Sequence, residues 1–379
     1  MKVLFSIHHI LNADLGAPGA TCNLAQELSG LGCQTEVLSM SDMDRGVENI
    51  RSHLVYPWFT YRRLSQSYRD YDVLDLSSGD GWILGRFGHA TGQLLVARSH
   101  GLEHIAHLAR IRKAEEGELN LSWKYKFYHG GFRLWEVAES FRRADLSFFL
   151  NGEDYAYAIE HLRVSPERTR ITSNGIANEL LGLPFSPEPN RHGEFRIVLI
   201  GSYSPRKIHN VPLILNKLLH QNANWSIGFL GTGVDEDLVR KDYARELQGR
   251  IEVIRHYPNK ALPGLLRNYD VLLFPSLSEG FGLAVFEAMA CGLAVVASRL
   301  PALQERLVEN DHVIFINPGD TQGIEAAITQ LASDYGLLRR RKQAAYCRAQ
   351  DFSWHHVAEQ TLKIYDDALN AKRRRAEHK

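Results

Sequence analysis

The sequence has no run of about 18 apolar residues, the length a membrane-spanning helix needs. It has only four cysteines, Cys22, Cys33, Cys291 and Cys347, and no two of them form a Cys-x-x-Cys pair. Four scattered thiols in a chain of this length do not make a disulfide framework. We therefore expect a protein of the reducing cytoplasm.

An excess of either charge is also lacking. The 44 Lys and Arg residues are balanced by 44 Asp and Glu residues, which gives a formal net charge of zero. Because nucleic-acid-binding domains carry a basic excess, we expect no nucleic-acid partner. With 44% hydrophobic and 23% charged residues, the chain has the composition of a globular protein. Its 379 residues predict two domains, at roughly 150 residues per domain.

Short apolar, β-branched runs alternate with longer helical patterns along the whole chain. Runs that are apolar on both faces favour parallel sheets covered by helices on both sides. Two such sets predict an α/β protein with two doubly wound domains, whose ligands bind beyond the carboxyl ends of the strands. The predicted strands are residues 2–7, 34–39, 72–76, 94–98, 146–150 and 169–172 in the first half, and 195–200, 225–230, 251–255, 271–274, 294–297 and 313–316 in the second.

A segment rich in proline separates the two sets of strands. Residues 183–193 contain three prolines and a glycine, which is typical of a stiff linker. We predict an N-terminal domain over 1–183, a linker over 184–193, a second domain over 194–351, and a C-terminal helix with a basic tail over 352–379.

The densest motif follows the predicted strand that ends at Phe274. Glu279 lies in a loop, and the glycines of Gly280-Phe281-Gly282 open a helix whose free N–H groups suit anions or hydroxyls. Glu287 lies eight positions after Glu279, about two helical turns, so both carboxylates face one side if the helix begins early. Such a pair suits a polyhydroxyl ligand. The alternative is one Glu at the helix dipole and one solvated Glu.

This block, with seven residues between the glutamates and Ala-Met-Ala-Cys-Gly after them, resembles the signature of the family-4 retaining glycosyltransferases of group 1 type. The resemblance covers nearly the whole chain. Asn174-Gly175-Ile176 resembles the turn that closes the family's first domain, and residues 201–207 its phosphate loop. Phe352-Ser353-Trp354 resembles the start of a terminal helix that crosses back to the first domain. The resemblance implies the GT-B fold, with two Rossmann-like domains facing a central cleft.

The resemblance also implies roles for residues of this motif. Glu279 is expected to contact the donor sugar, and Glu287 the ribose hydroxyls of the nucleotide. The backbone N–H groups of Phe281, Gly282 and Leu283 are expected against sugar hydroxyls and the diphosphate.

The loop that resembles the phosphate loop begins at Gly201 and ends with two adjacent cations, Arg206 and Lys207. Fixed cations stabilise the charge that develops on a departing diphosphate. The family often has Arg where this chain has Ser202, and Gly where it has Ile208. Lys207 matches the pattern, and we expect Arg206 to supply the missing guanidinium. The alternative is a pair of ordinary surface charges.

The first domain contributes weaker candidates. His100 follows a predicted strand and matches the family's histidine near the donor sugar, with His104 as a second choice; the alternative is a structural histidine. Gly16 and Gly19 resemble the family's glycine loop near the diphosphate and acceptor, although a plain helix-entry turn has the same spacing. Asp80 also ends a predicted strand and is a candidate for binding an acceptor hydroxyl.

Three further features have competing interpretations. His256 follows a strand where the family holds the base, mainly through backbone contacts. Asp235-x-Asp237 is a metal signature in a different glycosyltransferase fold, but here the acids begin a predicted helix, whose dipole accounts for them. We therefore expect no metal. Residues 122–128 and 132–143 mix aromatics with Lys and Arg; we expect their aromatics to face the core or the acceptor cleft rather than a membrane.

Together these features predict a retaining, metal-independent transfer of a hexosyl unit from a nucleotide-sugar donor to a hydroxyl of a glycan, lipid-linked or small-molecule acceptor. No cofactor is expected, since the nucleotide sugar is a co-substrate. A nucleotide-sugar epimerase of the same fold and a non-catalytic nucleotide-sugar-binding module are the alternatives. The basic run Lys372–Arg375 favours a weak, peripheral contact with the inner face of the membrane.

Overall fold

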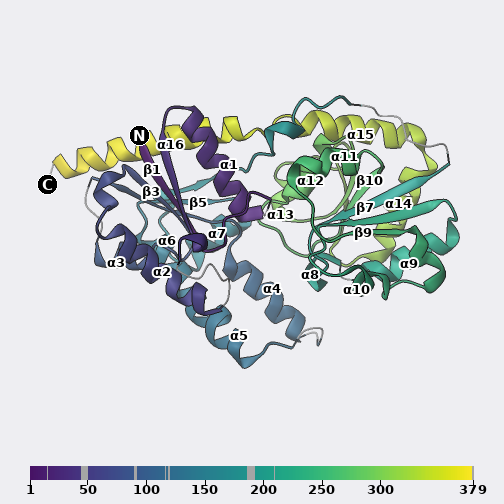
Figure 1. The fold of residues 1–379 in the computed structure, drawn as a ribbon, viewed down its shortest axis with the longest axis horizontal. Helices are drawn as coiled ribbons and strands as arrows, with labels where there is room; N and C mark the ends of the chain where they lie inside the picture. Colours follow the sequence, from purple (N-terminus) through teal and green to yellow (C-terminus); the bar gives the residue numbers. More distant parts are fainter. Residues whose placement is uncertain are drawn as a thin grey trace. The chain divides into compact units, whose positions relative to one another are not determined.

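The chain forms two compact units in a computed structural model that describes residues 1–14, 16–43, 50–88, 92–115, 117, 120–185, 193–208 and 210–377 (Figure 1). The first unit comprises Met1–Gly175 and Trp354–Lys379, and the second comprises Ile176–Ser353. The division therefore comes earlier than the expected boundary at residue 183, because residues 176–185 belong to the second unit. Residues 186–192 of the expected linker lie outside the described residues.

The first unit is built on a six-stranded parallel sheet in the order β2-β1-β3-β4-β5-β6. After β1 the chain moves to one side of the sheet, and from β3 onward it moves to the other. The carboxyl ends of β1 and β3 therefore form a topological switch point, where open α/β sheets bind ligands. The strands are β1 (Lys2–Ile7), β2 (Gln34–Ser39), β3 (Val73–Ser77), β4 (Leu94–Arg98), β5 (Leu146–Phe149) and β6 (Thr169–Ile171).

Helices cover both faces of this sheet. On one face, α1 and α16 pack against the strands through a cluster that includes Leu28, Phe148 and Tyr365. In Figure 1 the C-terminal helix α16, in yellow, lies with α1 beside the strands of the first unit. The helices are α1 (Gly16–Gly30), α2 (Ile50–Leu64), α3 (Trp82–Phe87), α4 (Glu103–Glu115), α5 (Trp123–Phe127), α6 (Arg133–Arg143), α7 (Gly152–Glu160) and α16 (Trp354–Glu377).

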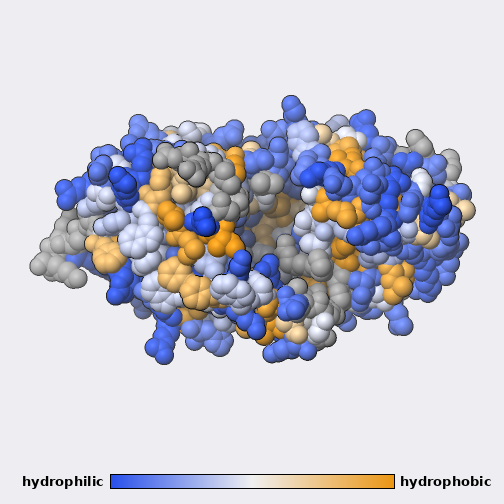
Figure 2. All heavy atoms as spheres, turned by 60° about the horizontal axis from the view of Figure 1, so that its bottom comes forward, coloured by the Kyte–Doolittle hydropathy of each residue, from blue (hydrophilic) through white to orange (hydrophobic). Residues whose placement is uncertain are grey.

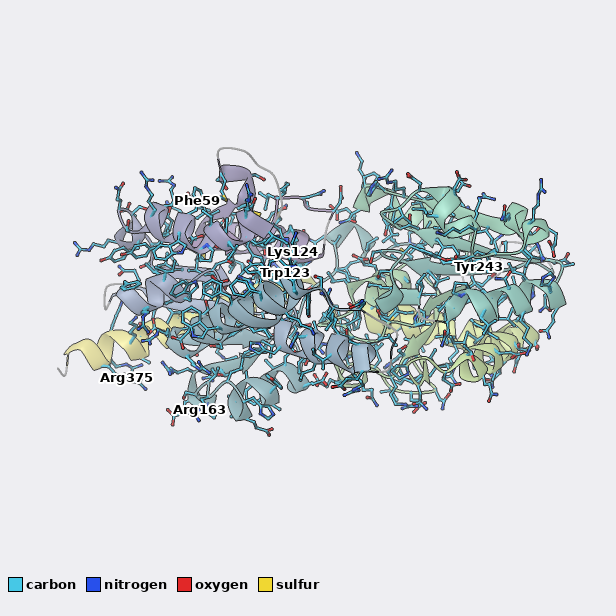
Figure 3. All side chains as sticks on the ribbon, turned by 90° about the horizontal axis from the view of Figure 1, so that it is seen from below. Phe59, Trp123, Lys124, Arg163, Tyr243 and Arg375 are labelled. Carbon is cyan, nitrogen blue, oxygen red and sulfur yellow. The ribbon has the colours of Figure 1, made fainter. Side chains whose placement is uncertain are left out.

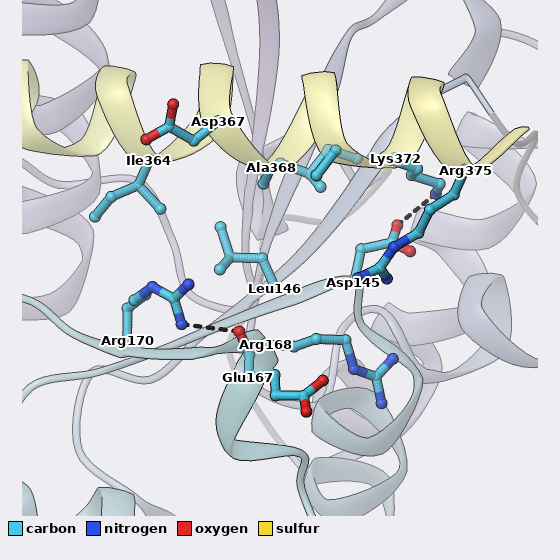
Figure 4. Close-up of a pocket in the computed structure, with 12 residues that line it drawn as sticks. Asp145, Leu146, Glu167, Arg168, Arg170, Ile364, Asp367, Ala368, Lys372 and Arg375 are labelled. Carbon is cyan, nitrogen blue, oxygen red and sulfur yellow. Dashed lines mark hydrogen bonds and ion pairs between the residues drawn. The ribbon is translucent and has the colours of Figure 1, made fainter. Parts of the chain in front are cut away.

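A buried polar network and an ion pair hold α16 on the sheet. Arg98 at the end of β4 pairs with Asp75 of β3 at 2.6 Å and donates to the Tyr365 hydroxyl of α16 at 3.2 Å. Tyr365 in turn donates to Asp75. Near the end of α16, Lys372 pairs with Asp145 at 2.6 Å, beside a groove of about 360 Å³ (Figure 4). The last helix is thus an integral part of the first unit.

The second unit has a parallel sheet in the order β12-β11-β10-β7-β8-β9. Here the switch point lies between β7 and β10. The strands are β7 (Phe195–Ile200), β8 (Trp225–Leu230), β9 (Ile251–Ile254), β10 (Val271–Phe274), β11 (Ala294–Ser298) and β12 (Ile314–Ile316). The helices are α8 (Pro205–Ile208), α9 (Val211–Gln221), α10 (Glu236–Arg240), α11 (Leu262–Leu266), α12 (Leu283–Ala290), α13 (Pro301–Gln304), α14 (Thr321–Ser333) and α15 (Tyr335–Ala349).

Each strand predicted from the sequence is present, with ends that differ by at most one residue. The two sheets of parallel strands covered by helices confirm the predicted α/β class. Within the part of the chain that the structure describes, no helix has the length and apolar character required to cross a membrane.

Candidate active site

Lys207 and Glu279 meet at the switch point of the second unit. Lys207 lies in α8, directly after β7, and Glu279 lies in the loop after β10. The Lys207 Nζ is 2.8 Å from Glu279 Oε1, and the Ser276 hydroxyl donates to the same oxygen at 2.6 Å. The Lys207 and Glu279 side chains are only 17% and 12% exposed. Two residues that the sequence predicted for one site thus form a partly buried ion pair.

The backbone and an aromatic ring hold Lys207 in place. Its Nζ lies 5.0 Å from the ring centroid of Phe274, a favourable position for a cation over a ring face. A Cβ placed on Gly201 would lie 3.3 Å from the same Nζ. The glycine at position 201 therefore leaves room for the lysine to fold back over the end of β7.

The helix does not begin early enough to include both Glu279 and Glu287, which was the condition for the two carboxylates to share one of its faces. Gly282 has φ +88°, a left-handed conformation that L side chains rarely adopt, and α12 begins only at Leu283. Glu279 therefore lies in the loop before the helix, whereas Glu287 lies within it. Burial raises the pKa of Glu287 to about 7, although the charge of Lys207 acts to lower it. The charge of Lys207 thus reaches both carboxylates.

Phe281 is buried in the core of the second unit. Its ring lies 4.8 Å from that of Phe286 and 6.2 Å from that of Phe352, and the Arg306 guanidinium lies over it. Its side chain therefore packs away from solvent. The contact of a ligand with the backbone N–H groups of Phe281, Gly282 and Leu283 stays a prediction.

Three other predicted positions of this unit have different surroundings. His256 is exposed in the loop after β9, and its neighbour Tyr257 approaches the end of β8 at Gly231. Asp235 pairs with Arg255 at 2.6 Å, directly before α10. Among the described residues, no group of three or more His, Cys, Asp or Glu side chains is arranged to hold a metal ion. The side chain of Arg206 lies outside the described part of the structure.

The first unit has a cavity of about 400 Å³ at the carboxyl ends of β1, β3 and β4. His100, predicted from the sequence, lines it after β4, and His100 Nε2 lies 3.5 Å from the Thr21 hydroxyl. Burial and the charge of Arg98 lower the pKa of His100 to about 3, so this imidazole is neutral at physiological pH. The cavity is lined by His8, His9, Ala17, His53, Ser77, Ser78, His100, Gly101, Glu103, Tyr128, His129 and Arg133.

Asp80 differs from its predicted role. Its carboxylate is buried, with one oxygen 2.8 Å from the Ser6 hydroxyl and the other 2.8 Å from His8 Nδ1. It is not among the residues that line the cavity. Burial raises the pKa of Asp80 to about 7 against the opposing charge of Arg133. Asp80 therefore orients His8, and His8 faces the cavity in its place.

Sequence reasoning missed several residues of this cavity. Arg133 comes from α6, yet it donates to the Ser78 carbonyl oxygen at 2.5 Å and lies 3.1 Å from His8 Nε2. Glu103 accepts from the Ser78 hydroxyl at 2.8 Å. The one available signal was the pair His8-His9, which directly follows the first strand. The positions of His53, His129 and Arg133 depend on tertiary packing.

The glycines before α1 and the second histidine have local structural roles. A Cβ on Gly19 would lie 2.4 Å from the Ala13 carbonyl oxygen, so the turn into the helix itself requires a glycine. A Cβ on Gly16 would meet nothing within 4 Å. His104 packs against Tyr157, and burial lowers its pKa to about 4. It does not line the cavity.

The expectation that the aromatics of residues 122–128 face the interior is wrong for α5. Trp123 and Phe127 are 73% and 74% exposed, and Lys124 and Lys126 lie between them in the sequence. Trp123 and Lys124 are labelled on this helix in Figure 3. Tyr128 is buried, at the start of the π-helical turn Tyr128–Phe132. Figure 2, which brings the lower side of Figure 1 forward, shows apolar residues at the surface of this unit.

Residues 185–348 match the model of the family described as glycosyl transferases group 1. This segment is a group 1 glycosyltransferase domain. It contains Lys207, Ser276, Glu279 and Glu287, so the ion pair at the switch point lies within the matched region.

The chain is also similar to individual group 1 relatives and to solved structures. It is 28% identical to glycogen synthase of Mycobacterium tuberculosis over 206 residues, which are 54% of this chain and 49% of that protein. The match thus spans about half the length of that relative. Sucrose-phosphate synthase of Thermosynechococcus elongatus has a TM-score of 0.77 at 18% identity, over 98% of this chain and 99% of that one. Anabaena HepE in complex with UDP has a TM-score of 0.70 at 18% identity, over 97% and 100%. These likenesses show the GT-B fold.

Proposed function

We propose that this protein transfers a hexosyl unit from a nucleotide-sugar donor to an acceptor hydroxyl, with retention at the anomeric carbon. The observation that carries the proposal is the Lys207–Glu279 pair at the β7–β10 switch point, inside the group 1 domain. A cation and a carboxylate at this point suit a ligand that combines phosphates with hydroxyls.

The donor would bind with its diphosphate toward Lys207 and its sugar toward Glu279. The N–H groups of the Gly282 turn and the start of α12 would face the anion, and Glu287 would accept from the ribose. HepE, a structural neighbour at 18% identity, was solved with UDP, which supports a nucleotide in a protein of this fold. We assign no base to the donor.

In the reaction, the bond between the anomeric carbon and the leaving phosphate oxygen breaks while the acceptor oxygen bonds to the same face of that carbon. The acceptor proton passes to the leaving phosphate, and Lys207 stabilises the charge that develops there. Arg206 would add a second cation. Glu279 orients the sugar and forms no covalent bond. None of these steps uses a metal ion or a cofactor.

The acceptor would bind in the cavity of the first unit. Its wall is rich in imidazole and hydroxyl groups, and neutral imidazoles offer both a hydrogen-bond donor and an acceptor to a hydroxyl. His100 is neutral and suits this role. The polar wall favours an acceptor that presents a sugar or another polyol, carried by a glycan, a lipid or a small molecule.

We also propose that the acceptor is reached at a membrane surface through α5. Its exposed Trp123 and Phe127 alternate with Lys124 and Lys126, a combination suited to the interface of an anionic bilayer. The C-terminal run contributes less, because Lys372 and Arg373 are paired with Asp145 and Asp72.

Labelled nucleotide sugars incubated with an acceptor extract test the function. A glycosyltransferase transfers label only when the extract is present, and nuclear magnetic resonance of the product shows the donor's anomeric configuration. Isomerised free donor would indicate an epimerase instead, and binding without either product would indicate a binding module. We expect Lys207→Ala to lower transfer by about 10²–10³. Lys217→Ala, which breaks a pair with Glu325 on the surface, must leave transfer unchanged.

A further inference from the structure

Lys207 and Glu279 form an ion pair with each other at the site where the proposed function requires both residues to bind the donor. Their atoms are 2.8 Å apart, and both side chains are mostly shielded from solvent. Shielding from water strengthens the interaction between charges, so this pair is stronger than an exposed one. A diphosphate that binds Lys207 therefore competes with Glu279 for the charge of this lysine.

Neighbouring groups keep Glu279 close to the lysine. Ser276 is fully buried, and its hydroxyl donates at 2.6 Å to the same carboxylate oxygen that contacts Lys207. Phe274 lies beneath the lysine on the other side. These contacts keep Glu279 beside Lys207, in position to pair with the lysine again when the phosphate departs.

The described charges around Lys207 are unequal in number, with two carboxyl groups near one ammonium group. Lys207 serves two carboxylates, since its charge also acts on Glu287 in α12. An arriving diphosphate adds further negative charge. An intact nucleotide sugar compensates, because its sugar hydroxyls donate to the carboxylate that has lost Lys207. A free nucleoside diphosphate has no such hydroxyls, and it leaves Glu279 facing phosphate oxygens of like charge.

We infer that Glu279 makes the donor site select the intact nucleotide sugar over the free nucleoside diphosphate, and that its return to Lys207 helps to expel this product. The inference rests on the proposed function and adds a second role for Glu279. When the nucleotide sugar binds, its sugar hydroxyls replace Lys207 as the partner of Glu279. Transfer of the sugar to the acceptor lets the ion pair form again.

Calorimetry on the full chain tests this exchange. Wild type is titrated with UDP, GDP and ADP and with their glucose and mannose conjugates, and the matching diphosphate and conjugate are taken forward. Glu279→Gln keeps an amide for hydrogen bonds but removes the charge. We expect it to bind the diphosphate about tenfold more tightly, the effect of one like charge removed at close range, and the conjugate no more tightly than wild type.

Two further variants separate charge from shape. Glu279→Asp retains the charge, so it must not bind the diphosphate more tightly than wild type. Glu325→Gln removes the carboxylate of the Lys217–Glu325 pair, 2.7 Å long on the surface of the same unit, and must leave both affinities unchanged. Inhibition by the diphosphate during turnover must become stronger in Glu279→Gln, relative to the KM of the donor.

The outcomes are distinct. If Glu279→Gln weakens the diphosphate and the conjugate equally, Glu279 is an ordinary binding group and the inference fails while the proposed function stands. If wild type binds none of the nine compounds, the proposed function fails and the inference fails with it.

Discussion

Glu287 is a carboxyl group whose charge changes near neutral pH, because burial raises its pKa to about 7. If the carboxylate accepts from the ribose, donor affinity must rise between pH 6 and pH 8 as the group ionises. Glu287→Gln must flatten this rise, and Glu287→Ala must weaken the binding of donor and diphosphate by about 1.5–3 kcal/mol. Calorimetry across this pH range measures both. If the affinity of Glu287→Gln for the donor still rose with pH, this would contradict the proposed contact between Glu287 and the ribose.

The same group has a predictable effect on stability. A folded-state pKa near 7, above the ordinary value of 4.5, means that the folded protein holds this proton more tightly than the unfolded chain. Stability is therefore lost as the pH rises from about 4.5 to 7. Glu287→Gln must melt at a higher temperature than wild type at pH 8, and the difference must shrink at pH 5.

The loop over residues 201–207 gives a third prediction at the residue scale. Losing one preorganised charge donor commonly lowers turnover by about 10²–10³, and we expect this loss for Lys207→Ala. If Arg206 takes the role of the arginine that the family often has at the position of Ser202, the turnover of Arg206→Ala must fall well below that of wild type. Arg206→Lys must recover only part of the turnover, since lysine lacks the planar guanidinium that binds a phosphate through two N–H groups. Ser202→Arg in the Arg206→Ala background must restore some activity. Near-wild-type turnover of Arg206→Ala would refute the idea.

At the same scale, the sequence predicted that Asp80 and His100 lie at strand ends but not the direction in which their side chains point. Both follow strands, which is why both were candidates. His100 lines the cavity, but Asp80 turns inward to Ser6 and His8. The choice depends on hydrogen-bond partners that lie far away in the sequence, so no local pattern reveals it. Arg133 was missed for the same reason.

Among the elements, α16 is held by the network of Tyr365, Asp75 and Arg98. Tyr365→Phe keeps the buried ring but removes its hydrogen bonds to charged groups, which are worth about 1.5–3 kcal/mol each. We expect a loss of that size in the free energy of unfolding, measured by urea titration. Tyr335→Phe, at an exposed tyrosine of α15, must change it by less than about 0.5 kcal/mol. Equal stability of the two variants would show that packing alone holds the helix.

The helix α5 carries the prediction about membranes. Wild type must cosediment with vesicles of anionic phospholipid at low salt, and added salt must release it. Trp123→Ser with Phe127→Ser must lose most of this binding because the apolar anchor is gone. Leu213→Ser, at an apolar residue of α9 that is 72% exposed, must retain it. No binding of wild type at low salt would refute the membrane proposal.

Elements could be predicted where local composition decides them. Most strands are short segments rich in Val, Ile, Leu and Phe, and the predicted strand ends agree with the structure to within one residue. The start of α12 could not be predicted. The left-handed conformation of Gly282 determines it, and a glycine adopts left-handed and right-handed conformations about equally well. The exposure of Trp123 and Phe127 also depends on how α5 packs, which the mixed pattern of aromatics and lysines does not specify.

For the molecule as a whole, we predict that catalysis needs no metal ion. The proposed mechanism stabilises the leaving diphosphate with Lys207 and Arg206 alone. Turnover must therefore survive excess chelator. Activity that disappears on chelation and returns with a divalent ion would instead revive the metal-binding interpretation of Asp235 and Asp237.

The position of α16 at the end of the chain has a consequence for synthesis. The first unit takes Trp354, Tyr365 and Leu369 into its core, and these residues leave the ribosome after the whole second unit. During translation the second unit is thus complete while the first still exposes the apolar face that α16 will cover. The unit whose synthesis begins first is therefore the unit whose core is completed last.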